Sequence, residues 1–331
     1  MTLQLKDKQV LVTGGAGYIG GHVVRMLQEQ GNHVRILDLA KPDQLEVPGS
    51  QFIAGDIRDA ATVKQAVEGC QVVLHLAANP NLWTRNSDDF ETVNHQGTRR
   101  VLEAAAQEGV ERTVYVSTES ILTPRQRTEV ISESVQTTLA DMIGPYCRSK
   151  WLAEQAAFQA AEAGQPVVIV RPSVPVGPGD HHGGPLTRMM RDFQEGRVKG
   201  WMPGQLNLVD VRDVAEGTVL AAERGEIGEA YLLVNENWTI REFMQYLAVL
   251  FDRKPPRARI PYSVALSFAY FEEAMCRMSR NGRIPMATVT GVKLTRRCFH
   301  FDGQRSREAL GISSMRCCRQ AVREMHEAVS A

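Results

Sequence analysis

The sequence predicts an α/β protein, a doubly wound parallel sheet followed by a smaller, mostly helical C-terminal lobe. Through the first half of the chain, short β-branched runs alternate with helical patterns. Unbroken apolar strands of this kind are typical of parallel sheets covered on both faces. After Arg171 the alternation ends and helical patterns prevail. We therefore divide the chain into a first domain, residues 1–175, and a second lobe, residues 176–331, with some exchange of chain between them.

Each element is predicted from its own pattern of apolar residues. The expected strands of the first domain are residues 9–13, 33–37, 51–54, 71–76, 113–116 and 166–170, and the expected helices are 18–30, 59–68, 88–107 and 146–164. Four Pro and four Gly between residues 171 and 185 predict a loop. In the second lobe we expect helices near 185–196, 211–224, 239–251 and 264–278, and a strand at 231–234.

Composition and charge exclude several classes of protein. The 331 residues carry 38 Lys and Arg against 38 Asp and Glu, so no attraction of the whole molecule to nucleic acid is expected. No apolar run reaches the roughly 18 residues of a membrane span, and the first ten or so residues do not resemble a secretory signal. The six Cys show no metal-binding spacing, so we expect no metal site and reduced thiols in a cytoplasm.

A glycine-rich loop joins the first expected strand to the first expected helix. Gly14, Gly17 and Gly20 form a G-x-x-G-x-x-G pattern, with Tyr18 and Ile19 inside it. Glycines at this spacing permit a tight turn and let backbone amides approach a pyrophosphate at the helix N-terminus. The loop therefore predicts a dinucleotide-binding site.

The ends of the next strands add candidate cofactor contacts. Asp38 ends the second strand, where a carboxylate accepts hydrogen bonds from a ribose diol and repels a 2′-phosphate, so we expect NAD rather than NADP. Lys41 nearby leaves NADP as the alternative. Asp56 would face the adenine amino group with Ile57 as an apolar wall, or would instead cap the next helix. After the fourth strand, small side chains would let the backbone approach the cofactor in the segment Leu76, Ala77 and Ala78.

Tyr146 and Lys150 form a Y-x-x-x-K pattern on an expected helix, and the four-residue spacing places both side chains on one face. A phenol with a pKa of about 10 is a poor base at neutral pH, and a nearby ammonium favours the phenolate and lowers that pKa. Thr118, at the end of the fifth strand, would hold a substrate oxygen. An exposed helix face is the alternative, but the glycine loop and Asp38 favour a catalytic group.

Two further segments, Arg171–Asp180 and Asn207–Gly217, complete a set of motifs that spans most of the chain. Together with Thr13–Gly20, Asp38, Gly55–Asp56, His75–Ala78, Thr118, Tyr146 and Lys150, they make the sequence resemble an extended short-chain dehydrogenase/reductase of the NAD-dependent epimerase/dehydratase superfamily. The finer resemblance is to hopanoid-associated sugar epimerase-like proteins and to the 3β-hydroxysteroid dehydrogenase branch.

The resemblance implies a Rossmann fold and roles for single residues. It implies that Tyr146 is the acid/base, that Lys150 lowers the pKa of Tyr146 and binds ribose, and that Thr118 positions the reacting hydroxyl. It also implies cofactor contacts from Pro172 and Val174, and a homodimer. The substrate itself is not implied by the fold.

Three positions depart from the nucleotide-sugar epimerases. Val174 stands where those enzymes typically carry an Asn that helps to hold the diphosphate side of the substrate, and Val176 replaces a usual Tyr. The first change favours a lipid alcohol, and the second removes a polar group from the rim of the pocket. Glu119 follows Thr118 at a place where sugar dehydratases use acidic side chains, but Ser120 occupies the next position. We expect Glu119 to point to water, with a catalytic role as the alternative.

Trp83 and His181 are the candidate substrate contacts outside the catalytic group. Trp83 follows the fourth strand and would stack on a sugar or sterol ring, or would anchor its loop. His181 would line the same cleft, and adjacent His residues on a loop point apart, which argues against a metal site. Residues 277–307 hold eight Lys and Arg against one acidic residue. With the apolar stripe of residues 264–278, this predicts either a solvated face or contact with an acidic membrane surface.

The motifs together predict an NAD-dependent oxidoreductase that acts at a secondary alcohol or ketone carbon of a lipid-like, sterol- or hopanoid-type small molecule. A nucleotide-sugar 4-epimerase or dehydratase of the same superfamily is the first alternative. A non-catalytic dinucleotide sensor is the second, although such sensors often lose the Tyr/Lys pair that this chain retains. The expected compartment is the cytoplasm, with membrane association as an option.

Overall fold

The computed structural model describes residues 3–39, 50–125, 129–279 and 282–330; Lys41 and Arg280 of the basic segment lie outside these ranges. In the described part, seven parallel strands form one sheet: β1 (Gln9–Thr13), β2 (His33–Asp38), β3 (Gln51–Ala54), β4 (Val72–His75), β5 (Arg112–Val116), β6 (Val167–Pro172) and β10 (Ala230–Leu233). Their order across the sheet is β10-β6-β5-β4-β1-β2-β3. This is the doubly wound arrangement that the sequence predicts.

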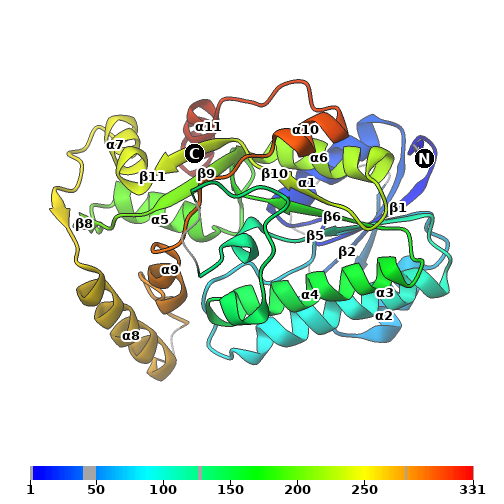
Figure 1. Ribbon diagram of the computed structural model, residues 1–331, viewed down its shortest axis with the longest axis horizontal. Helices are drawn as coiled ribbons and strands as arrows, with labels where there is room; N and C mark the ends of the chain where they lie inside the picture. Colours follow the sequence, from blue (N-terminus) through cyan, green and yellow to red (C-terminus); the bar gives the residue numbers. More distant parts are fainter. Residues whose placement is uncertain (1–2, 40–49, 126–128, 280–281, 331) are drawn as a thin grey trace.

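Helices cover both faces of this sheet (Figure 1). One face carries α1 (Tyr18–Glu29), α6 (Val211–Arg224) and α10 (Gln304–Leu310), and the other carries α2 (Ala60–Val67), α3 (Thr98–Gln107) and α4 (Gly144–Glu162). Strand β1 shows why the sheet is buried on both sides. Val10 and Val12 pack into the cluster under α1 and α6, whereas Leu11 packs into the cluster under α2 and α3.

The second lobe lies beyond the carboxyl ends of the strands. It contains a small sheet of three strands, β7 (Val174–Val176), β9 (Gln205–Asp210) and β11 (Glu236–Thr239), and a short pair, β8 (Gly200–Trp201) and β12 (Ala258–Arg259). Its helices are α5 (Pro185–Gln194), α7 (Ile240–Leu250), α8 (Tyr262–Met278), α9 (Val289–Leu294) and α11 (Cys318–Ser330). Arg188 of α5 donates to the Asn81 side chain in the loop after β4, which ties the lobe to the first domain. Strand β10 and helix α6 return to the large sheet, so the two parts exchange chain; a boundary at residue 175 stays a prediction.

The expected strands and helices of the first domain are confirmed with end shifts of one or two residues, with one exception. The single helix expected over 88–107 begins with a π-helical segment, Phe90–Gly97, before α3. The wider turn accompanies a specific contact: the Asn94 carboxamide accepts from the Asn79 amide at 2.7 Å and donates to the Asn79 carbonyl at 3.2 Å. The segment thereby holds the loop that follows β4.

In the second lobe, the expected loop over 171–185 is wrong in its first part, because β6 continues to Pro172 and β7 follows. Strand β9 is not apparent from its sequence, since Asn207 and Asp210 interrupt its apolar residues. Both are fully buried and satisfied: Asn207 accepts from Ser173, and Asp210 caps α6 by accepting from the Arg212 amide. The predicted cap at Thr239 is confirmed as a capping box with Glu242.

Candidate active site

The glycine loop forms a tight turn between β1 and α1. Gly14 has a φ of 72°, and a Cβ there would come within 2.7 Å of the Ala77 backbone nitrogen. At Gly20 a Cβ would come within 2.0 Å of the Gly14 carbonyl oxygen. Helix α1 begins after Gly17 without a side-chain cap, so the partial positive charge of its N-terminus faces the loop. This geometry fits the pyrophosphate of a dinucleotide such as NAD.

Asp38 is held beside this loop. Its Oδ2 accepts a hydrogen bond from the Ala16 amide at 2.9 Å, and its Oδ1 accepts from the Leu39 amide at 2.8 Å. Arg35, on the same strand, is engaged elsewhere: its guanidinium donates to Gln51 and to two backbone carbonyls near the end of α2. A carboxylate, rather than this guanidinium, therefore stands at the place expected for a ribose.

Tyr18 and Asp56, two of the expected cofactor contacts, make protein contacts of their own. The Tyr18 hydroxyl donates to the Gly177 carbonyl at 2.8 Å, which ties α1 to the segment after β7. Asp56 pairs with Arg58 at 2.6 Å, and hydrogen bonds from Arg58 lower the pKa of Asp56. Asp59 caps α2, so the capping alternative for Asp56 is wrong.

The other expected cofactor contacts lie at different depths. The Ala77 amide donates to the Thr13 hydroxyl at 3.3 Å, next to Gly14, with Leu76 and Ala78 half-buried beside it. Ile57 is buried in the cluster under α2 and α3, and Ile19 packs against the cluster on the other face of the sheet. Pro172 is the last residue of β6, whereas Val174 packs against the apolar cluster of the second lobe.

Thr118, Tyr146 and Lys150 meet at the carboxyl end of β5. Burial of the Tyr146 hydroxyl raises the pKa of this residue above its usual value, and a hydrogen bond with Thr118 opposes the shift. The Lys150 Nζ donates to the Val116 carbonyl at 2.8 Å and lies 4.6 Å from the Tyr115 ring centre. The structure thus brings Tyr146 and Lys150, expected on one helix face, to the strand end that carries Thr118, and their catalytic roles stay predictions. The expected depression of the Tyr146 pKa is not what this structure shows, because burial has the larger effect.

A buried ion pair fixes the same helix. Glu154 lies four residues after Lys150 on α4, and its carboxylate accepts from Arg171 of β6 at 2.9 and 2.7 Å. Burial lowers the pKa of Lys150 to about 7, and the charge of Glu154 opposes this shift. Sequence reasoning missed Glu154, although its four-residue spacing from Lys150 indicates the shared helix face.

Glu119 does not point to water, so this expectation is wrong. The residue is 5% exposed, and its Oε2 accepts a hydrogen bond from the Thr118 hydroxyl at 3.0 Å. Burial raises the pKa of Glu119 from 4.5 to about 7, and the hydrogen bond from Thr118 opposes the shift. The turn Glu119–Leu122 is packed under Cys147 of α4, which explains why the carboxyl is enclosed. Glu119 therefore acts on the orientation of the Thr118 hydroxyl.

The expected substrate residues lie at the same end of the sheet. Trp83 is half-buried, and its indole N–H is enclosed with no hydrogen-bond partner in the described part of the chain, so its role as a substrate contact stays a prediction. His181 is exposed. The neighbouring His182, which was expected to line the cleft together with His181, is the one that reaches the glycine loop, 3.3 Å from the Ala16 carbonyl.

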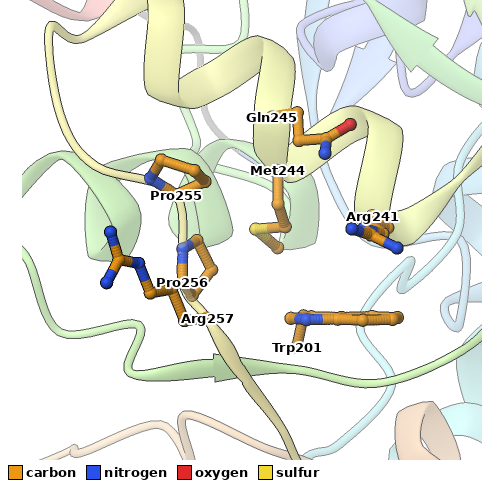
Figure 2. A pocket seen from close by; sticks show the side chains of 7 residues that line it. All are labelled: Trp201, Arg241, Met244, Gln245, Pro255, Pro256 and Arg257. Carbon is orange, nitrogen blue, oxygen red and sulfur yellow. The ribbon is translucent and has the colours of Figure 1, made fainter.

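A separate cavity of about 260 Å³ lies within the second lobe, and none of its lining residues belongs to the candidate active site. Figure 2 shows the Arg241 side chain above the flat face of Trp201, with the guanidinium 5.6 Å from the ring centre. The other lining residues are Met244, Gln245, Pro255, Pro256 and Arg257. Within the described ranges, no three His, Cys, Asp or Glu side chains are grouped to hold a metal ion, and no helix is long and apolar enough to cross a membrane.

Comparison with known proteins decides the family. The model of the NAD dependent epimerase/dehydratase family matches residues 10–233, which include the glycine loop, Asp38, Thr118, Tyr146 and Lys150. The chain belongs to this family. It is an NAD-dependent oxidoreductase with a Rossmann-type domain, and the alternative of a non-catalytic sensor is set aside.

Several relatives cover nearly the whole chain. A candidate dihydroflavonol 4-reductase from Synechocystis sp. is 35% identical, over 91% of this chain and 89% of that protein. Sterol demethylase protein B from Methylococcus capsulatus is 30% identical, over 91% and 92% of the two chains. The crystal structure of MoeE5 with UDP-glucuronic acid and NAD is similar with a TM-score of 0.74 and 25% identity, over 97% and 99%. NAD is the cofactor of this family.

The position of Asp38 generates a prediction about cofactor choice. NAD should bind more tightly than NADP, by at least about tenfold, because the additional phosphate would meet a carboxylate. Asp38→Asn keeps an oxygen for the Ala16 amide but removes the charge, so it should narrow the difference in affinity between NAD and NADP. Fluorescence titration of each cofactor against the unaltered chain and the variant measures these affinities. Equal or tighter binding of NADP by the unaltered chain would contradict the assignment.

The buried Glu119 generates a prediction about stability. Its folded-state pKa of about 7 lies above the ordinary 4.5, so its stabilising contribution is complete below pH 4.5 and is lost as the pH rises through about 7. Relative to the unaltered chain, Glu119→Gln should therefore gain up to about 3 kcal/mol in unfolding free energy between pH 4.5 and pH 8. Urea unfolding at both pH values tests this, with exposed Glu108→Gln as the control. The prediction would be contradicted if Glu119→Gln and the unaltered chain differed in unfolding free energy by the same amount at both pH values.

Proposed function

We propose that this enzyme interconverts a ketone and a secondary alcohol on a lipid-like, sterol- or hopanoid-type substrate. The observation that carries the proposal is the enclosed Tyr146 hydroxyl, hydrogen bonded to Thr118 at the same carboxyl edge of the parallel sheet as the glycine loop. A raised pKa keeps the phenol protonated at neutral pH, which is the state that donates a proton to a ketone oxygen. NAD, when bound, supplies the hydride acceptor or donor.

The residues of the site divide the remaining work. The Thr118 hydroxyl holds the substrate oxygen, and Glu119 sets whether that hydroxyl donates to the substrate or to a carboxylate. Lys150, held by the Val116 carbonyl, is placed to bind ribose and to stabilise negative charge on the Tyr146 oxygen after proton transfer. Glu154 and Arg171 position Lys150 without touching the substrate.

The apolar character of the segment after β6 supports a lipid-like substrate. Val174 packs with the apolar cluster around Leu208, and the Ser173 hydroxyl is already used as a donor to Asn207. A diphosphate buried here without enough donors would cost several kcal/mol, about 2–7 for a neutral polar group and more for a charge. The relative named as a sterol demethylase protein is consistent with this class of substrate.

A nucleotide-sugar epimerase or dehydratase is the second candidate. The observation that favours it is Arg297, whose Nη1 is enclosed with no hydrogen-bond partner among the described residues, although its Nη2 donates to the Asp141 carbonyl. Such a nitrogen would suit an anionic group. Arg296, the neighbouring cation, instead lies 4.4 Å from the Tyr262 ring centre. The likeness to MoeE5 bound to UDP-glucuronic acid agrees with this alternative.

A homodimer and a cytoplasmic location remain part of the proposal. They come from the sequence resemblance and from the scattered Cys residues. Size-exclusion chromatography with light scattering would test the dimer directly.

The first test of the proposal concerns Tyr146. Tyr146→Phe should lower kcat by about 10²–10⁴-fold and leave the Kd of NAD unchanged, because only the proton donor is lost while the ring contact with Phe90 is kept. Lys150→Ala should weaken both cofactor binding and rate. The exposed Tyr270→Phe is the matched control and should behave as the unaltered enzyme. A Tyr146→Phe rate close to that of the unaltered enzyme would remove Tyr146 from the mechanism.

The second test concerns the class of substrate. In thermal-shift measurements with NAD present, sterol-like or polyprenyl-derived alcohols should raise Tm more than UDP or UDP-sugars, because Val174 offers an apolar surface. Val174→Asn should reduce the shift caused by the lipid alcohols. Strong stabilisation by UDP alone would refute the lipid preference and would make the nucleotide-sugar enzyme the better assignment.

A further inference from the structure

Helix α8 presents its large apolar side chains to solvent. The stripe of residues at 4,3,4,3 spacing faces outward: Val264, Phe268, Phe271, Met275 and Met278. Phe271 is 60% exposed and Met278 79% exposed. The buried face of the helix consists instead of Ala265, Ala269, Glu272 and Cys276, and the two alanines let it pack closely on α9. An apolar stripe of this length on the outer side of a helix indicates a surface that binds something.

Helix α8 lies at the edge of the molecule, away from the large sheet (Figure 1). The segment that follows the helix adds Ile284 and Met286, both exposed. This segment is held against the helix, because the Met286 amide donates to Glu272 at 3.3 Å. We call the stripe together with Ile284 and Met286 the α8 apolar face.

The charge around the α8 apolar face is strongly one-sided. Residues 253–297 hold ten Lys and Arg against two acidic residues, in a chain whose total charge is zero. Both acids are engaged: Glu272 is buried and pairs with Arg283, and Glu273 pairs with Arg277 at 3.8 Å and accepts from the Val289 amide. Exposed cations lie at both ends of α8: Arg253, Lys254, Arg257 and Arg259 precede the helix and Arg296 lies over the ring of Tyr262 at its first residue, whereas Arg277 and Arg283 lie in its last turn and just after it.

The α8 apolar face is joined to the loop that carries Trp83. Arg85 of this loop donates to the Cys276 carbonyl at 3.3 Å and also to the Ser279 carbonyl. Helix α9, on which α8 packs, approaches the start of α4, since a Cβ on Gly144 would meet the Thr290 side chain. The α8 apolar face is therefore connected to α4, the helix that carries Tyr146, through the packing of α8 on α9 and the contact of α9 with the start of α4.

We propose that the α8 apolar face binds the surface of an anionic phospholipid bilayer, with the stripe inserted among the acyl chains and the flanking cations at the headgroups. A helix with exposed Phe and Met on one side and Lys and Arg at its borders has the composition of a helix that lies in a membrane interface. The contact with the Trp83 loop then gives a lipid substrate a short route from bilayer to active site, a step that rests on the proposed function.

The charges favour a bilayer over a second copy of this chain as the occupant. A two-fold contact between two α8 helices would place the same basic borders opposite each other, and α8 exposes no acidic side chain that would pair with them. An anionic lipid surface, in contrast, supplies negative charge along the whole face.

Sedimentation with vesicles tests the proposal on the full chain. At about 0.1 M salt, the protein should bind vesicles of phosphatidylcholine with phosphatidylglycerol at least about tenfold more strongly than vesicles of phosphatidylcholine alone, and about 0.5 M salt should weaken binding several-fold. Phe268→Ser with Phe271→Ser should reduce binding to the anionic vesicles by at least about tenfold. Val249→Ser, which changes an exposed apolar side chain of α7 outside this face, should leave binding unchanged.

Binding of NAD by each variant verifies that it is folded. Equal binding to neutral and anionic vesicles, or full binding by the Phe268→Ser/Phe271→Ser protein, would overturn the proposal. So would a dimer that this double variant converts to monomers, because a second copy would then cover the face. Turnover of a lipid alcohol delivered in detergent should be the same in the double variant and the unaltered enzyme. Vesicle binding without any such turnover would contradict the proposed substrate and leave the membrane surface standing.

Discussion

The attachment of α4 to the large sheet is the constraint on which the active site depends. Lys150 is enclosed and donates to the Val116 carbonyl of β5, and one turn later Glu154 pairs with Arg171 of β6. Removing one partner of a buried ion pair leaves an uncompensated charge, which costs on the order of 3–5 kcal/mol. The two contacts fix both the rotation of α4 about its axis and its height above the strands. Tyr146 is on the same face of the helix, so its hydroxyl is brought to Thr118.

Enclosure of this group also sets its protonation chemistry. Burial moves the pKa values of Glu119 and Lys150 toward each other, to about 7 in both cases, from opposite directions. Burial raises the pKa of Tyr146 at the same time. The site therefore combines a protonated phenol with two groups whose pKa values lie near 7. The hydrogen bond from Thr118 to Glu119 connects one of these groups to the hydroxyl that would hold the substrate oxygen.

The sequence was sufficient for the large sheet, for the glycine turn and for the shared helix face of Tyr146 and Lys150, because all three follow from regular spacing of residues along the chain. The sequence was not sufficient where the burial of a polar side chain depends on residues that are distant in sequence. Glu119 was expected to face water, and its enclosure depends on Cys147 and its neighbours, which are distant in sequence. Strand β9 was missed because Asn207 and Asp210 interrupt its apolar residues: Asn207 is buried against Ser173, which is distant in sequence, and Asp210 is buried where it caps α6.

The claim that most needs a direct measurement is that the site takes a lipid-like alcohol or ketone. The Tyr146→Phe protein, loaded with NADH, can be incubated with a mixture of membrane lipid extract and nucleotide sugars, and the molecules that it retains can be identified by mass spectrometry. The account predicts that a polycyclic or polyprenyl-derived ketone or alcohol is retained, and that Val174→Asn in the same background lowers its amount. Retention of a nucleotide sugar in its place would contradict the account.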